Sequence, residues 1–453
     1  MIAAMQPSYP ARKLDGLDIT LVAVFLLGLY LGVSLQISEK VPLTCAPSGF
    51  AGLIMLWRRR DQVQPRHLAG LLGVVCVYLG SILAASDYEF LGKRFTGLLQ
   101  LTYSLAIGYA MFLTLVHGER RQIANLLLTF CLVIIVGCLL ETYAGLRPLS
   151  DAVRERIYAS SNVYDADLRD QLLYGRIRPK LFTSEPSAVT FAYTHYSSVW
   201  LVVSPWRWKL PVYFGLMALA LFVLPGPTLM LMLLLTVPYL VFLAGARAGG
   251  RPSTTRLVGS LALSLVLVGL AIVLGRVFFA ERLNDLATGK DASFFFRFTG
   301  PMLVAFDLLR DHPWAGAGLT GEPYIADRVI DIFMNSPSFE AAWQVGKVSD
   351  TLTNFFWLHW IYLGLVWGVI CLVAVSIWLR MLGTPSVLYC WAVWIILGQA
   401  SGSYVGPKTW AVLLIAAAVA ILTAGARQPR SSPRPLPRVH LQPHLLDSSG
   451  YLR

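Results

Sequence analysis

The chain has 453 residues, of which 56% are hydrophobic and only 14% are charged. Soluble domains carry about 25% charged residues, so this composition excludes an ordinary soluble protein and indicates one embedded in a membrane. The formal net charge is +12, but the surplus cations lie in short polar segments between apolar runs and in the tail. That distribution favours membrane topology and lipid headgroups, and not nucleic acid, as the reason for the charge.

Apolar runs of about 17 to 24 residues recur along the chain, and each is long enough to cross the hydrocarbon core as a helix. We therefore predict an all-α fold, a polytopic transmembrane helical bundle of about 12 spans. Because the sixth span carries several polar side chains, it should face protein or water and not lipid. The predicted spans lie near residues 17–36, 42–57, 67–85, 95–116, 122–145, 186–204, 208–224, 226–244, 256–279, 354–379, 385–402 and 408–425.

Basic residues in the short connections set the orientation. With the N-terminus inside, every cytoplasmic segment carries Lys or Arg, as in WRRR at 57–60 and HGERR at 117–121, which satisfies the positive-inside rule. We predict that both termini are cytoplasmic and that the Pro- and Arg-rich tail, residues 426–453, is disordered.

The same orientation places two large loops on the outer face, residues 146–185 between the first five spans (1–145) and the central spans (186–279), and residues 280–353 before the last three spans (354–425). The segment PMLVAFDLLRD at 301–311 has apolar residues at helical spacing. It predicts an amphipathic helix on the membrane surface.

The stretch RIRPKLFTSEPSAV, which ends the first loop, is the first candidate site. Arg176, Arg178 and Lys180 are two positions apart, so an extended segment would project all three to one side, where they would form an anion site. Ser184 would cap a helix that begins near Pro186. The alternative is purely structural: the cations pair with nearby acidic residues of the same loop, and the polar residues only begin the helix.

The second candidate, FFFRFTGPMLVAFDLLRDHPWAGAGL at 294–319, places Arg297 at headgroup level and His312 in a glycine-containing turn. His312 is a candidate general acid or base, with turn stabilisation as the alternative. In a third segment, Asp350 and Asn354 are candidate substrate contacts, although capping the next helix is the other reading of both. Tyr193 is a further candidate glycan contact or a buried hydrogen-bonding group. No motif for a metal, a P-loop or a dinucleotide appears in the sequence.

Taken in order, three motifs resemble the O-antigen ligase and polymerase superfamily of bacterial envelope polysaccharide assembly. They are RxRPxLFTSEPS before a mid-chain span, RxxxxMxxAxxxxxxHPWAGAG in the large outer loop, and TNFxxLxxxxLGLVWG at the start of the next helix. The remaining spans agree with the family only in number and hydropathy.

The resemblance implies inverting, metal-independent glycosyl transfer at the outer face of the bacterial inner membrane, with an undecaprenyl-diphosphate-linked oligosaccharide as donor and no cofactor. It also implies that arginines bind the diphosphate and stabilise the leaving group, and that a carboxylate or imidazole takes the proton of the acceptor hydroxyl. The residues are Arg176, Arg178, Lys180 and Arg297 for the diphosphate, with Arg178 and Arg297 foremost, and Glu185 or His312 for the proton.

One departure favours the polymerase branch: ligases of this family present HxHN before the late helix, where this chain has Thr351, Leu352, Thr353 and Asn354. We therefore expect a polysaccharide polymerase for exopolysaccharide, capsule or O-antigen, with bilayer lipids, a chain-length regulator and export machinery as partners and no nucleic acid. The alternatives are a ligase-type glycan transferase, a lipid-linked glycan flippase or transporter, and a non-catalytic assembly subunit.

Overall fold

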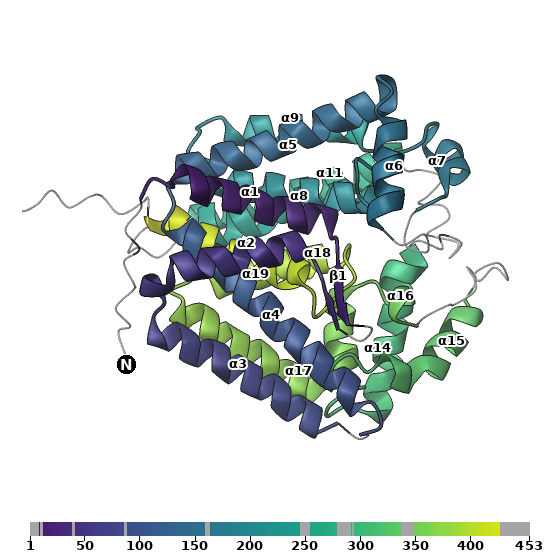
Figure 1. The fold of residues 1–453 in the computed structure, drawn as a ribbon. Helices are drawn as coiled ribbons and strands as arrows, with labels where there is room; N and C mark the ends of the chain where they lie inside the picture. The colour runs from purple at the N-terminus through teal and green to yellow at the C-terminus, as the bar shows by residue number, and fades with distance from the viewer. Residues whose placement is uncertain are drawn as a thin grey trace, which may run out of the picture.

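The computed structural model describes residues 9, 12–38, 41–85, 88–158, 164–244, 254–278, 291, 294–336 and 348–425 (Figure 1). The predicted cytoplasmic tail, residues 426–453, lies outside the described residues. So do the middle of the second large loop and the side chain of Asp350.

Helices account for nearly all regular structure in the described part of the chain. The α-helices are α1 (Gly16–Leu31), α2 (Ala46–Arg58), α3 (Pro65–Leu83), α4 (Leu91–Val116), α5 (Arg120–Tyr143), α6 (Arg147–Ile157), α7 (Asp167–Tyr174), α8 (Pro186–Val203), α9 (Lys209–Val223), α10 (Leu231–Pro238), α11 (Thr254–Phe278), α14 (Gly300–Asp311), α15 (Ala326–Met334), α16 (Val348–Thr351), α17 (Phe355–Met381), α18 (Val387–Gly398) and α19 (Pro407–Gly425). Short 3-10 helices are η1 (Arg60–Gln62), η3 (Pro227–Met230) and η6 (Glu322–Ile325), and π-helical turns are η4 (Tyr239–Ala244) and η5 (Phe295–Thr299). Two short strands, β1 (Leu35–Ser38) and β2 (Val41–Leu43), pair antiparallel.

The protein is an all-α helical membrane protein. Each predicted span coincides with a helix or helical run, and 7 of them are long and apolar enough to cross a membrane: α3, α4, α5, the run Pro227–Ala244, α11, α17 and α19. Helices α1, α9 and α18 are apolar but shorter. The number of spans, about 12, stays a prediction.

The first predicted span is too long at its C-terminal end. Helix α1 stops at Leu31 because Gly32 takes a left-handed conformation (φ 69°) and closes the last turn, a common helix ending. The chain then forms the β1–β2 hairpin, and α2 begins only at Ala46. The second span was predicted to start at residue 42. Because Pro42 lies in β2, its helix α2 starts four positions later.

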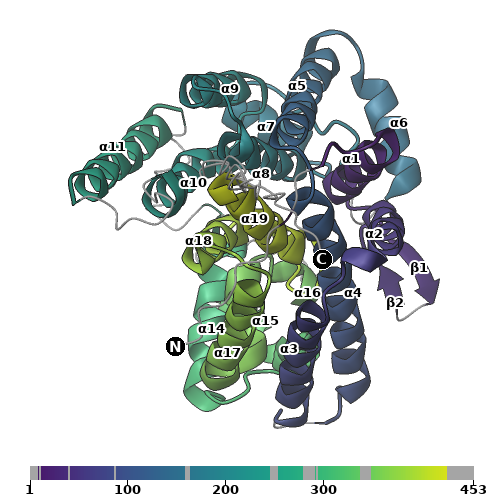
Figure 2. The ribbon, with the colours of Figure 1, turned by 90° about the vertical axis from the view of Figure 1, so that its left-hand side faces the viewer.

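Among the described helices that are long and apolar enough to cross a membrane, α19 is the most enclosed, with 83% of residues 407–424 buried. It packs against α4, α8 and α18, and Figure 2 shows it in the middle of the bundle. By contrast, most side chains of α11 are exposed, and this helix stands at the edge beside α10 (Figure 2).

The two long inter-span segments lie at the same end of the bundle. Helices α6 and α7 of the first, and α14, α15 and α16 of the second, gather opposite the end at which α1 begins (Figure 1). The predicted helix at 301–311 is confirmed as α14, which buries Val304, Ala305 and Leu308. Its place on a membrane surface stays a prediction.

The turn HPWAGAG after α14 docks onto a break in α17. Gly364 has φ 64° and ψ −170° inside that helix. This break leaves backbone N–H and carbonyl groups without partners in the helix, and they bond the turn instead. The N–H of Leu365 donates to the carbonyl of Pro313 at 2.7 Å, and the N–H of Ala317 donates to the carbonyl of Ile361 at 2.8 Å. The glycines of the turn therefore allow close backbone contact with α17.

Candidate functional site

A wide cavity lies at the end of the bundle that carries the two long loops, with an empty volume of about 3490 Å³ that includes space open to solvent. Its walls come from α7, the start of α8, η3 and α10, α11, η5 and the segment before α19. Apolar side chains such as Phe191, Leu231, Ile272, Phe294 and Phe298 line much of it. The charged residues among the described lining are Arg169, Arg178, Arg276, Arg297 and Lys408, against Glu185 and Asp291. This surplus of cations beside apolar walls suits an anionic group attached to an apolar chain.

Arg297 and Glu185 form an ion pair on the wall of this cavity. Nη2 of Arg297 lies 3.1 Å from a carboxylate oxygen of Glu185 and 3.1 Å from Oγ of Ser187. The side chains remain 29% and 40% exposed, respectively, so a ligand in the cavity can reach both. No recorded hydrogen bond among the described residues uses Nε or Nη1 of Arg297, which leaves one edge of its guanidinium for an anion.

The pKa of Glu185 reflects these cations. Desolvation by itself raises the pKa of this carboxyl, but Arg297, the hydrogen bond from Ser187, Lys408 and Arg178 together outweigh it, so the pKa lies below its ordinary value. Glu185 is therefore an ionised carboxylate at neutral pH. In that form it can accept a proton or orient a hydroxyl group, but it cannot donate a proton.

Buried side chains fix the backbone that leads to Glu185. Leu181 and Phe182 both have positive φ, 36° and 64°, which is costly for residues with side chains. The carboxylate of Glu141, only 2% exposed, accepts the N–H groups of Lys180 at 2.9 Å and Leu181 at 2.6 Å. Oγ of Ser150 accepts the N–H of Phe182 at 3.0 Å.

Arg154 completes this support from α6. It is 2% exposed, and it donates to the carbonyls of Thr183 at 2.7 Å and Ser184 at 3.1 Å. Helix α8 begins at Pro186, as predicted, but its N-cap is Glu185 without a side-chain cap bond. The predicted capping role of Ser184 is therefore wrong. Arg154 instead fixes the backbone of Ser184 by donating to its carbonyl.

Arg178 lines the cavity but is already paired. Its Nε lies 2.8 Å from the fully buried carboxylate of Asp170, and its Nη2 donates to the hydroxyl of Tyr164 at 3.2 Å. The guanidinium also lies 4.8 Å from the ring centre of Tyr174. This pairing agrees with the structural alternative for Arg178, but the residue is also part of the cavity lining, so its role toward a diphosphate stays a prediction.

The three cations of RIRPK do not form one site. Nη1 of Arg176 donates to the hydroxyl of Tyr143 at 2.9 Å and Nη2 donates to the carbonyl of Phe222, outside the cavity lining. Lys180 is buried and lies 2.9 Å from Asp167. The prediction that their alternation places them on one side is wrong, because local carboxylate, hydroxyl and carbonyl groups take two of them elsewhere.

His312 also lies apart from the cavity. It ends α14, and its Nε2 lies 3.4 Å from the hydroxyl of Tyr324. Neither residue belongs to the described lining. This arrangement agrees with the turn-stabilising alternative for His312 and leaves Glu185 as the candidate proton acceptor within the cavity.

The candidate glycan contacts have structural partners. Tyr193 is fully buried, and its hydroxyl donates to the carbonyl of Leu216 at 2.9 Å, which contradicts a direct contact with glycan. Asn354 caps α17 by accepting from two N–H groups at 3.1 Å each. Its Nδ2 donates to the carbonyl of Arg297 at 2.8 Å, so Asn354 positions Arg297 and lies outside the lining. The side chain of Asp350 is not among those described.

The sequence reasoning missed three of the lining cations, Arg169, Arg276 and Lys408. A signal for two of them was present. Arg276 and Lys408 lie at span ends that the predicted orientation places on the outer face, where the positive-inside rule disfavours cations. An anionic partner or ligand would explain a basic residue at such an end.

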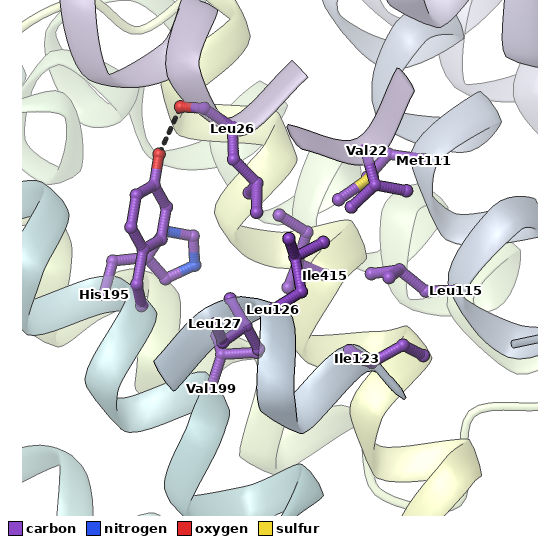
Figure 3. Close-up of a pocket in the computed structure, with 11 residues that line it drawn as sticks. Val22, Leu26, Met111, Leu115, Ile123, Leu126, Leu127, His195, Val199 and Ile415 are labelled. Atoms are coloured by element: carbon purple, nitrogen blue, oxygen red, sulfur yellow. Dashed lines mark hydrogen bonds between the residues drawn. The ribbon is translucent and has the colours of Figure 1, made fainter. Parts of the chain in front are cut away.

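A second, narrow apolar space, with room for about one water molecule, lies inside the bundle (Figure 3). Leu26, Met111, Leu127, Ile415 and other apolar side chains surround His195, whose Nε2 has no hydrogen-bond partner among the described residues. Its described lining contains no lysine or arginine, so it offers nothing for a diphosphate.

The part of the chain that the structure describes contains no group of three or more His, Cys, Asp or Glu residues placed to hold a metal ion. In comparisons with protein-family models, with curated proteins and with solved structures, none matches this chain.

Proposed function

We propose that this protein is a polysaccharide polymerase that joins undecaprenyl-diphosphate-linked oligosaccharide repeat units at the outer face of the bacterial inner membrane. The observation that carries the proposal is the cavity, which combines a surplus of cations with apolar walls in a bundle of membrane-type helices. A lipid-linked donor has the matching order of parts, with a diphosphate between an apolar chain and a glycan. The resemblance of the outer-loop motifs to the polymerase family supports the same choice.

In the proposed reaction an acceptor hydroxyl attacks the anomeric carbon of the donor while the bond from that carbon to the diphosphate oxygen breaks. The negative charge that develops on the leaving diphosphate lies beside Arg297 and Arg178, which stabilise it electrostatically. The hydroxyl proton passes to the carboxylate of Glu185, which already accepts a hydrogen bond from Ser187. Attack on the face opposite the leaving group gives inversion, and no metal takes part.

The test is to incubate the purified protein in detergent micelles with lipid-linked repeat units from its source and to follow glycan length on a gel. Because a micelle does not separate two aqueous compartments, transport gives no signal. We expect lengthening that persists when a chelator is added. Absence of lengthening with donor lipid that a control polymerase extends would reject the proposal, and transfer of a single finished glycan to another acceptor would favour a ligase.

A further inference from the structure

Lys408 lies in the first turn of α19, half-buried, on the wall of the cavity. A Cβ atom added to Gly32 would lie 3.0 Å from its Nζ, so the amine is next to the C-terminal end of α1. Among the described residues, no hydrogen bond or ion pair to the amine of Lys408 is recorded. Among the residues that the structure describes, this amine therefore has no ion-paired carboxylate.

The charges around Glu185 explain why Lys408 differs from the two arginines. Lys408, Arg297 and Arg178 all belong to the described lining of the cavity that contains Glu185, and all three lower the pKa of its carboxyl. Arg297 is paired with Glu185 itself and Arg178 with Asp170. Of these three cations, Lys408 is the one for which the described residues provide no ion-paired anion.

The position of Lys408 is fixed by its surroundings. The segment before α19 is anchored at Tyr404, whose hydroxyl lies 2.5 Å from that of Tyr78 and 2.9 Å from Nδ1 of His359. Oγ of Ser104 donates to the carbonyl of Val405 at 2.7 Å. A cation held on such a rigid element is suited to bind a ligand, since little of its backbone must be ordered on binding.

We propose that Lys408 is a ligand-binding residue that holds the second phosphate of the lipid diphosphate, while Arg297 holds the first. This inference rests on the proposed function, because it takes the lipid diphosphate as the donor's anionic group. The chemistry of the two side chains divides in this way: the guanidinium fork pairs with two oxygens of one phosphate, and the ammonium acts as a compact charge with rotating donors on the other. The competing explanation is structural, in which Lys408 only neutralises the carbonyl end of α1.

The experiment compares binding of farnesyl diphosphate and farnesyl monophosphate to the full-length protein in detergent micelles, by calorimetry, in the wild type and in Lys408→Met. We expect the substitution to weaken diphosphate binding about tenfold to a hundredfold, the loss of one charged hydrogen-bonded contact, and to change monophosphate binding less than about twofold. Lys408→Arg should restore most of the preference for diphosphate. Lys13→Met, at an exposed lysine near the start of α1, is the matched control.

An unchanged preference for diphosphate in Lys408→Met would overturn the inference, even if the melting temperature fell, since that result is expected of a structural lysine. If the wild type binds both probes equally, the second-phosphate site is rejected. The proposed function is judged separately, because glycan lengthening by the wild type can succeed when this inference fails, and the reverse also holds.

Discussion

Nη2 of Arg297 donates to the carboxylate of Glu185 across 3.1 Å, although the two residues are 112 positions apart. The backbone carbonyl of Arg297 is in turn held by Asn354, at the start of α17. The cavity wall is thus a single unit made from three segments. A change at one of these residues alters the other two, so their effects on activity should not add.

Arg297→Ala should lower the rate of glycan lengthening by about a hundredfold or more, since it removes the donor nearest to the developing charge. The level of protein in the membrane should stay close to that of the wild type, because exposed ion pairs contribute at most about 1 kcal/mol to stability. Arg310→Ala is the control, at an exposed position of α14. Near-normal polymer from Arg297→Ala would exclude a diphosphate contact at this residue.

His312→Asn should retain most of the lengthening rate, because the ring lies outside the described cavity lining and contacts Tyr324. Glu185→Gln should lose most of it, since an amide cannot take the proton of the acceptor hydroxyl. The measurement is the initial rate for both variants at equal amounts of folded protein. The opposite order would make His312 the base and would reject Glu185.

Glu185 should also affect stability in a pH-dependent way. Its pKa is lower in the folded protein than its ordinary value of 4.5, so its contribution to folding is fully present above that value. It disappears as the pH falls through the lower pKa of the folded state. We expect the melting temperature of the wild type to exceed that of Glu185→Gln at neutral pH, and the two to converge as the pH falls below the lowered pKa of Glu185 in the folded protein. A gap that is constant over this range would contradict the assigned direction.

Glu141→Gln should destabilise the segment that leads to Glu185. The amide retains one acceptor oxygen but places an NH₂ group opposite the second backbone N–H, so one buried donor loses its partner, at a cost of about 1–3 kcal/mol. The expected result is a lower melting temperature and faster proteolysis within residues 176–185. Glu155→Gln, at an exposed position of α6, should change neither. Equal effects of the two substitutions would show that the buried hydrogen bonds of Glu141 contribute nothing.

Gly364→Ala should destabilise the protein strongly. An added Cβ would lie 2.7 Å from the backbone nitrogen of Gly316 and 2.8 Å from the carbonyl oxygen of Pro313, and the backbone conformation alone costs about 1–3 kcal/mol for a residue with a side chain. Gly92→Ala is the control, because nothing lies within 4 Å of its added Cβ. Thermal unfolding in micelles measures both. A stable Gly364→Ala variant would show that the turn and α17 can separate without loss.

Much of the fold was predictable because the membrane imposes length and hydropathy on its helices. The start of α8 at Pro186 and the helix α14 followed from proline placement and apolar spacing. The early end of α1 was less accessible. A glycine inside an apolar run marks a helix end only when its backbone is left-handed. Nothing in the sequence around residues 28–35 distinguishes Gly32, which ends α1, from Gly28, which lies inside it.

The candidate site was predictable only in part. Arg178, Glu185 and Arg297 were identified and lie on the cavity. The fate of Arg176 and Lys180 depends on Tyr143 and Asp167, and such pairings follow from the folded path of the loop. Spacing along an extended segment determines the side of the backbone on which a side chain begins. It does not determine which partner a long side chain reaches.

The central position of α19 has a consequence for biogenesis. This helix is the last along the described chain, yet it fills the middle of the bundle and brings Lys408 to the cavity. The helices that precede α19 are therefore synthesised before the helix that fills the middle of the bundle. Because Lys408 and the segment before α19 line the cavity, its wall is complete only when α19 is in place. We expect a chain that ends before Pro407 to lack this wall and to be cleared by membrane proteases.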